Sequence, residues 1–178
     1  MVDRIAAEHG TVDILVNNAG NHCKKYIWDM SVEEYKSVLD VHLTGAFALT
    51  KAVVPYMKEK RHGRIIFQAS MTSYIGQPMV AGYASAKAGY LGLIHTLTAE
   101  LAEYGITANA IAPGWIDTPM FHKATDGDPQ RLGKILGRIP AKMVGDPMDI
   151  GMVTACSDAA RYISGSCIPV DGGALIGF

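Results

Sequence analysis

The chain of 178 residues is poor in cysteine and carries almost no excess charge. Its three cysteines, Cys23, Cys156 and Cys167, show no metal-ligand spacing, and an odd number argues against a disulfide framework. We therefore expect free thiols, as in a reducing compartment, and no metal site. A formal net charge of −1 gives no basic surface for a nucleic acid or an anionic membrane, so neither is an expected partner.

Long apolar runs and a targeting segment are missing as well. No uninterrupted apolar stretch reaches the roughly 18 residues of a membrane-spanning helix, and Met1–Arg4 lacks the start of a signal peptide. The sequence thus predicts a soluble, cytoplasmic protein without a membrane segment. Apolar residues (49%) and glycines (19 of them) are plentiful, which favours one α/β domain over residues 1–178.

Short apolar runs alternate with longer helical patterns, which is typical of a parallel sheet. The apolar runs predict four strands: Asp13–Val16, Arg64–Ala69, Ile106–Ala112 and Ser166–Val170.

Two long helices are predicted between these strands. Ser31 and Glu34 form a capping box, in which each side chain satisfies an N–H group at the start of a helix that continues to about residue 60. Pro55 is expected to bend or loosen this helix near its end. The second helix covers residues 83–104. Weaker helical patterns cover residues 1–9, 129–137 and 147–160.

Tyr83 and Lys87 are four residues apart, so they share one face of the second helix. A tyrosine with a pKa near 10 moves protons poorly at neutral pH. A neighbouring ammonium group lowers that pKa by favouring the phenolate, and the phenol can then exchange a proton with a carbonyl or an alcohol. Taken alone, the pair is a weak signal, because Tyr and Lys occur at this spacing by chance in many helices and an exposed helix surface explains it better.

The surroundings of this pair favour a site. Ser70 follows a predicted strand and precedes Tyr83, while Asn17–Gly20 and Pro113-Gly114 follow two other strands. Ligands of open parallel sheets bind outside the carboxyl ends of the strands. We therefore expect these segments to converge on one edge of the sheet.

In order and spacing, four motifs of the chain resemble the short-chain dehydrogenase/reductase family. They are Asn17-Asn18-Ala19-Gly20, Ser70 with Tyr83 and Lys87, Pro113–Thr118 and Val170–Gly173. The resemblance implies a partial Rossmann-like, doubly wound parallel sheet with flanking helices, made of strands 4-5-6-7 of the family order. It also implies an NAD(P)-dependent oxidoreductase that interconverts a secondary alcohol and a ketone.

The same resemblance implies a role for each residue. Tyr83 would be the general acid/base, Lys87 would lower its pKa and hold the nicotinamide ribose, and Ser70 would orient the substrate oxygen. The cofactor, NAD or NADP, would be bound by Asn18, Ala19, Gly20, Tyr83, Lys87, Pro113, Gly114, Ile116 and Thr118.

Two departures from the family lie inside the chain. Many relatives carry an asparagine where this sequence has His42, and that asparagine holds a water of the proton relay. His42 could hold the same water and titrate near neutral pH, which makes it a fourth candidate catalytic residue; a structural histidine is the alternative. In addition, a segment near Gly151–Cys156 is about two residues shorter than usual, and two residues turn a helix by about 200°. Either that helix packs differently or a loop absorbs the change.

The largest departure is at the start. Upstream of Asp13 there is no glycine-rich turn to bring a pyrophosphate to a helix N-terminus, and no residue to read the ribose 2′ position. We expect an N-terminally truncated domain that binds a dinucleotide poorly, with Asp13–Val16 as an exposed apolar edge. A fragment, a natural short product and a complete enzyme with an unusual cofactor site all remain open.

The segments Ser70–Ser73, Gly76–Pro78 and residues 171–178 are similar to the gluconate 5-dehydrogenase-like branch. This similarity implies a polyol, sugar or sugar acid as substrate. Met120–Leu136 is the expected lid, in which His122, Lys123 and Arg131 either meet a carboxylate or face solvent.

Long helices of this family commonly pair as a four-helix bundle. We therefore expect a homodimer or homotetramer through the helices near residues 31–60 and 83–104. The alternative to an active enzyme is a truncated, catalytically silent member that acts through this dimerisation.

Overall fold

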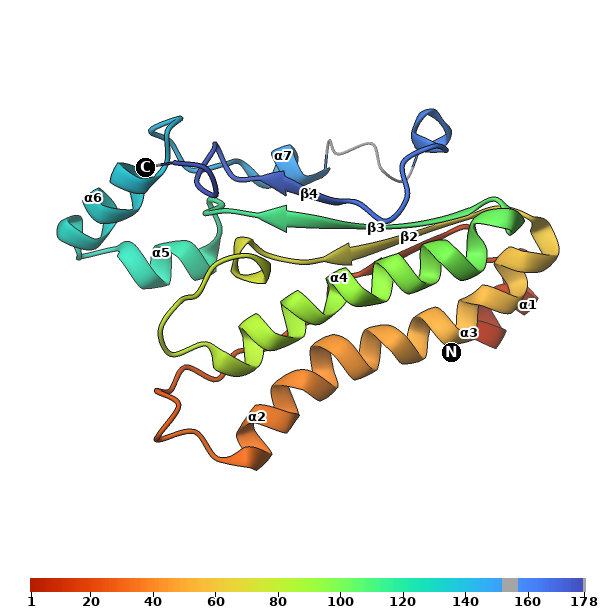
Figure 1. Cartoon of the computed structure of the whole chain (residues 1–178), viewed down its shortest axis with the longest axis horizontal. Coiled ribbons are helices and arrows are strands. Elements are labelled where there is room, and N and C mark those ends of the chain that lie inside the picture. The colour runs from red at the N-terminus through yellow and green to blue at the C-terminus, as the bar shows by residue number, and fades with distance from the viewer. Residues whose placement is uncertain (152–156, 178) are drawn as a thin grey trace.

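Four parallel strands form one sheet in the order β1-β2-β3-β4 in the computed structural model, which describes residues 1–151 and 157–177 (Figure 1). The bounds are β1 (Ile14–Asn17), β2 (Gly63–Gln68), β3 (Ile106–Pro113) and β4 (Cys167–Val170). Each predicted strand is present, with its ends within one residue of the expected positions. The predicted α/β class with a parallel sheet is confirmed.

The two long predicted helices are also present, and they lie side by side on one face of the sheet (Figure 1). The first begins at the predicted capping box, where Glu34 N donates to Ser31 Oγ at 3.1 Å and Ser31 N to Glu34 Oε2 at 2.9 Å. It continues through Pro55 without interruption to Lys60. Its segments are α2 (Val32–Leu39), the π-helical η1 (Asp40–Thr44) and α3 (Gly45–Lys60); the second helix is α4 (Ala81–Leu101) followed by η3 (Ala102–Tyr104).

Shorter helices complete the fold. They are α1 (Val2–His9), η2 (Met71–Ser73), α5 (Pro119–Thr125), α6 (Pro129–Arg138), α7 (Pro147–Gly151) and η5 (Asp158–Ala160). The helix predicted over 147–160 is thus described only at its two ends. Cys156 and most of the shortened segment 151–156 lie outside the described residues.

The core lies between the sheet and α3 and α4. Phe67 of β2 packs against Tyr90 of α4 with ring centroids 5.1 Å apart, and both side chains are fully buried. On the other face a smaller apolar cluster forms around Ile66 and Ile111, against which Ile150 of α7 packs. Helical segments therefore flank the sheet on both sides, as the Rossmann-like expectation requires.

The strand β1 is the edge of the sheet in the described part of the chain. Ile14 is 49% exposed and Val16 is 54% exposed, whereas Leu15 packs against the core. Alternating side chains of a strand point to opposite faces, so Ile14 and Val16 share the face away from α3. The predicted exposed apolar edge at residues 13–16 is confirmed.

One helix in the described residues, Val32–Lys60, is long and apolar enough to cross a membrane by length and composition alone. Helices in the core of water-soluble proteins meet the same criterion. Part of this helix packs on the sheet and on α4, and its outer face exposes Val41 and Phe47.

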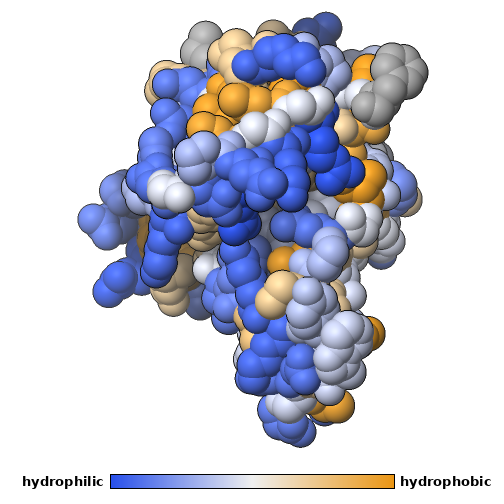
Figure 2. Space-filling model, turned by 90° about the vertical axis from the view of Figure 1, so that its left-hand side faces the viewer, coloured by the Kyte–Doolittle hydropathy of each residue, from blue (hydrophilic) through white to orange (hydrophobic). Residues whose placement is uncertain are grey.

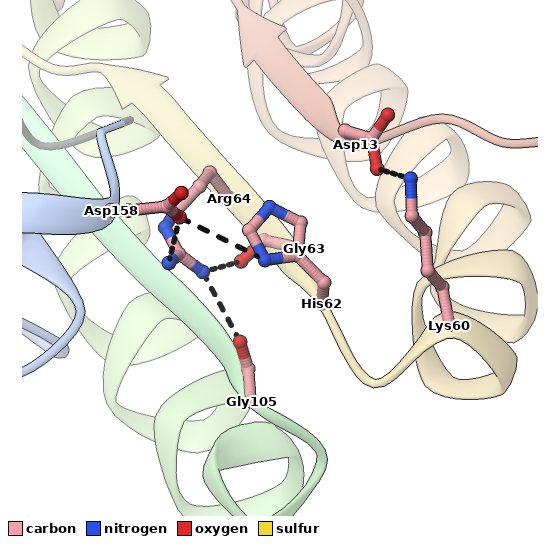
Figure 3. A network of polar contacts seen from close by, with 7 residues as sticks. All are labelled: Asp13, Lys60, His62, Gly63, Arg64, Gly105 and Asp158. Carbon is pink, nitrogen blue, oxygen red and sulfur yellow. Dashed lines mark hydrogen bonds and ion pairs between the residues drawn. The ribbon is translucent and has the colours of Figure 1, made fainter.

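A buried arginine ties together the amino ends of the strands, opposite the expected site (Figure 3). Arg64 is 3% exposed, and its Nη1 donates to the carbonyl oxygens of Gly63 at 2.8 Å and Gly105 at 3.1 Å. Its Nη2 donates to the largely exposed Asp158 at 3.1 Å. This network fixes the strand starts, because a buried guanidinium needs several acceptors at once.

Candidate active site

The carboxyl ends of the strands border a cavity of about 510 Å³. Figure 2 views the molecule from this end, where hydrophilic surface surrounds smaller hydrophobic areas. Seven of the predicted site residues line the cavity: Asn18, Ser70, Tyr83, Pro113, Gly114, Ile116 and Thr118. The predicted convergence of these segments on one edge of the sheet is what the structure shows. Ala19, Gly20, His42 and Lys87 are not among the residues that line it.

Tyr83 is the third residue of α4 and is half-buried in the cavity wall. Burial raises the pKa of its phenol, and a hydrogen bond with Ser70 acts in the opposite direction. The phenol is therefore protonated at neutral pH, which suits donation to a carbonyl oxygen.

Lys87 lies one turn further along α4 and is 3% exposed. Its Nζ is 5.4 Å from the centre of the Tyr83 ring and donates to the carbonyl oxygen of Gln68 at the end of β2. Burial lowers the pKa of the ammonium group to about 8. Burial is the largest influence on the pKa of Tyr83 in this structure and raises it, while the Lys87 ammonium group lies against the ring. That Lys87 lowers this pKa stays a prediction.

Ser70 follows β2 and is 8% exposed. Its Oγ accepts a hydrogen bond from Thr72 N at 3.2 Å and so caps η2, which fixes the hydroxyl beside Tyr83. A serine hydroxyl has one donor and two acceptor positions, so the donor remains available while Thr72 is bound.

His42 lies in η1 and is 3% exposed. Its Nε2 is 2.8 Å from Asn21 O and 3.1 Å from Asn21 N, and burial lowers the pKa of its imidazole. Its Nδ1 is buried without a hydrogen-bond partner. The Asn21 contacts fit a structural histidine, and the unpaired Nδ1 leaves room for a relay role, which stays a prediction.

The segment after β3 is held by backbone bonds. Gly114 N donates to Val170 O at 3.0 Å, and the stretch around Ile116 pairs with Gly145. Thr118 Oγ1 accepts from Phe121 N at 3.2 Å and so caps α5. These bonds place Ile116 and Thr118 in the cavity wall.

Two cavity residues with basic side chains were not foreseen: His22 and Lys24. They stand two and four residues beyond Gly20, in the loop that leaves the carboxyl end of β1. Their place after a strand end was the only signal that could have found them. His22 stacks on Tyr83 with ring centroids 4.2 Å apart.

The lid residues Met120–Leu136 divide into two groups. Arg131 lines the cavity, as expected for a residue that meets a carboxylate. His122 instead pairs with Asp117 at 2.6 Å and Asp126 at 3.1 Å, and these hydrogen bonds, that of Asp126 first, raise its pKa. Lys123 is not among the residues that line the cavity.

The cavity fits the nicotinamide end of a dinucleotide. Asn18, Ser70, Tyr83 and Thr118 bring amide and hydroxyl groups to its wall, beside the turn at Gly114. Such groups hold ribose and carboxamide by hydrogen bonds. No group of three His, Cys, Asp or Glu side chains that could hold a metal ion occurs among the described residues, and Cys23 and Cys167 are free thiols.

A parallel sheet with this cavity at its carboxyl edge defines a Rossmann-like protein of the dinucleotide-dependent kind. The sequence model of the family described as enoyl-(acyl carrier protein) reductase matches residues 1–174. The chain belongs to the short-chain dehydrogenase/reductase family and is an NAD(P)-dependent oxidoreductase.

Individual relatives agree with this assignment. The chain is 42% identical over 175 residues to the 3-oxoacyl-[acyl-carrier-protein] reductase FabG of Escherichia coli, covering 97% of this chain and 70% of the relative. It is 36% identical over 178 residues to FabG of Thermotoga maritima, covering 99% and 71%. A gluconate 5-dehydrogenase from Burkholderia cenocepacia, solved in complex with NADP and tartrate, superimposes with a TM-score of 0.93 at 30% identity, covering 99% and 70%.

Proposed function

We propose that the protein interconverts a secondary alcohol and a ketone by hydride transfer, with Tyr83 as general acid/base. The observation that carries this proposal is the position of Tyr83 and Ser70 together in one cavity wall at the carboxyl edge of the sheet. A bound nicotinamide supplies the hydride in one direction and accepts it in the other.

In the reducing direction, the Ser70 hydroxyl donates to the carbonyl oxygen of the substrate and so stabilises the negative charge that develops there. Tyr83 transfers its phenolic proton to the same oxygen as the carbonyl carbon gains the hydride. In the oxidising direction the phenolate takes the proton from the alcohol. Lys87, charged at neutral pH, faces the Tyr83 ring and stabilises the phenolate while it exists.

We propose that the cofactor is held by Asn18, Lys87, Ile116 and Thr118, with Ala19, Gly20, Pro113 and Gly114 shaping the backbone around it. Asn18, Ile116 and Thr118 line the cavity, which supports this assignment.

For the substrate we propose a polyol, a sugar or a sugar acid. Lys24 and Arg131 line the cavity, whereas its described lining includes no Asp or Glu, and this charge pattern favours a substrate with a carboxylate. The Burkholderia relative was solved with tartrate, itself a hydroxy acid. The second candidate is a 3-oxoacyl thioester, which is supported by the 42% identity to FabG.

We further propose a homodimer or homotetramer through α2, α3 and α4. The first long helix exposes two large apolar side chains, Val41 (40%) and Phe47 (52%), which a second copy would cover. A catalytically silent protein that acts through the same helices is the competing function.

The proposal is tested by fluorescence titration with NADPH and NADH, followed by turnover assays with gluconate and related sugar acids and with an acetoacetyl thioester. Tyr83→Phe should abolish turnover and leave cofactor affinity nearly unchanged, whereas the exposed Tyr162→Phe should match the parent protein. Cofactor binding without turnover on either substrate class would support the silent alternative. Full turnover by Tyr83→Phe would show that Tyr83 is not the acid.

A further inference from the structure

His22 has no role in the reaction proposed above, although its side chain contacts Tyr83, the proposed general acid/base. Its imidazole stacks on the Tyr83 phenol with ring centroids 4.2 Å apart and the planes inclined by 28°. Stacked aromatic rings attract at such distances. Both side chains belong to the wall of the same cavity.

A second imidazole meets the same phenol from another direction. The ring of His42 stands edge-on to Tyr83, with centroids 5.3 Å apart and an interplanar angle of 84°. Tyr83 therefore has one aromatic neighbour on its face and another across its plane. Together they restrict the swing of the phenol and its rotation about the Cβ–Cγ bond.

The backbone that carries His22 is anchored to this arrangement. Asn21, its neighbour in the chain, contacts His42 Nε2 through both its N–H and its carbonyl oxygen, at 3.1 Å and 2.8 Å. His42 in turn is held at its own carbonyl oxygen by Tyr90 Oη at 3.0 Å. The loop at His22 is thus fixed against η1 and α4, which gives an otherwise exposed side chain a defined position.

We propose that His22 is a positioning residue that keeps the Tyr83 phenol directed at Ser70 and covers one face of its ring. The inference rests on the proposed role of Tyr83. Without the stacked ring, the phenol would sample other orientations, and water would reach it more freely.

The groups around His22 keep it neutral. Burial lowers the pKa of its imidazole, and Lys24, His42 and Lys87 add repulsion, while Tyr83 itself is uncharged at neutral pH. The imidazole therefore acts through its ring and adds no charge beside Lys87. The phenyl ring of His22→Phe should therefore preserve the positioning of Tyr83, whereas the methyl group of His22→Ala should not.

The first test needs no turnover. The protein is labelled with ¹³Cζ-tyrosine, the Tyr83 signal is assigned by its loss in Tyr83→Phe, and its titration is followed by NMR in the parent, His22→Phe and His22→Ala. Because burial raises the pKa of Tyr83, uncovering its ring in His22→Ala should move the pKa back toward the ordinary value. His22→Phe should titrate like the parent.

The second test is kinetic. His22→Ala should lower kcat by about three- to tenfold, the range that corresponds to loss of one aromatic pair, with little change in the KM for the cofactor. His22→Phe should stay within about twofold of the parent.

Two outcomes would overturn the inference. In one, His22→Ala titrates and turns over like the parent, so the stack does nothing. In the other, His22→Phe falls as far as His22→Ala, so the ring nitrogens act and the stacking does not. If the parent itself shows no turnover, the proposed function fails, and the NMR titration still decides whether His22 positions Tyr83.

Discussion

Gly20 lies directly against the imidazole of His42. A Cβ atom built on Gly20 would come within 2.3 Å of His42 Cε1, far inside the contact limit. His42 cannot easily move aside, because it is buried and bound to Asn21 and Tyr90. Glycine is therefore required at position 20 because of its close packing against His42. Its backbone conformation is not the reason, since φ of Gly20 is not positive and other residues adopt such angles.

Gly20→Ala should lower the free energy of unfolding by about 1–3 kcal/mol, the usual cost of forcing a methyl group against a side chain that cannot move aside. Gly133→Ala is the matched control, since nothing lies within 4 Å of a Cβ at Gly133 in α6. That change should be neutral or stabilising by up to about 1 kcal/mol. Urea unfolding measures both; equal stability of the two variants would contradict the close approach.

The sequence was sufficient for the strands because their signals are local. Apolar runs such as Ile65–Phe67 and the capping box at Ser31 act over a few residues, and each appears in the structure as expected. Two features depend on contacts across the fold. The π-helical η1 forms where His42 meets the loop at Asn21, and α3 continues through Pro55 while it packs on the sheet.

The position of the site was also predictable from the sequence, but two of its properties were not. The motifs located Ser70, Tyr83 and Thr118 at one edge, because the carboxyl ends of parallel strands meet there. The direction of the Tyr83 pKa was not predictable, since it depends on how deeply the phenol is buried. His22 was not predictable either, because its contact with Tyr83 joins a loop and a helix that are far apart in the chain.

Lys87 should make stability depend on pH. Burial lowers the pKa of its ammonium group from 10.5 to about 8, so the unfolded chain binds this proton more tightly than the folded one. Unfolding therefore takes up a proton between about pH 8 and 10.5, and this group's contribution to the free energy of unfolding rises with pH across that window. The gain should be up to about 3 kcal/mol.

Lys87→Met removes the titrating group and keeps the length of the side chain. The difference in unfolding free energy between the parent and Lys87→Met should shift in favour of the parent from pH 7 to pH 10, as measured by urea unfolding at each pH. Groups remote from position 87 titrate alike in both proteins and cancel. A difference that stays constant with pH would mean that Lys87 keeps its ordinary pKa in the folded chain.

At the amino ends of the strands, the hydrogen bonds of Arg64 to backbone carbonyl oxygens should contribute far more to stability than its ion pair with Asp158. Arg64→Met should lower the free energy of unfolding by about 1–3 kcal/mol, because two carbonyl oxygens, those of Gly63 and Gly105, lose their donor. Asp158→Asn should cost less than about 1 kcal/mol, since the carboxylate is exposed. Thermal unfolding ranks the two; a larger loss for Asp158→Asn would contradict this reading.

Thr118 should affect cofactor binding both by its own contact and by capping α5. Thr118→Val removes the acceptor for Phe121 N, and loss of such a cap costs about 1 kcal/mol. Exchange of the Phe121 amide hydrogen should speed up about fivefold, and the KM for the cofactor should rise. Thr118→Ser keeps the oxygen and should restore both values; failure of serine to do so would mean that the methyl group matters more than the cap.

A charge placed on the exposed side of the first long helix should show whether the protein associates through this helix. Phe47 is 52% exposed in the isolated chain, and we expect it to be covered by a second copy in solution. Phe47→Glu would place an unpaired charge in that contact, which costs about 3 kcal/mol or more and weakens association at least a hundredfold. Tyr162→Glu, at a fully exposed position outside these helices, adds the same charge as a control. In sedimentation velocity the parent and Tyr162→Glu should run as a dimer or tetramer and Phe47→Glu as a monomer. A parent protein that is monomeric at every concentration would refute the interface, and the apolar face would then need another explanation.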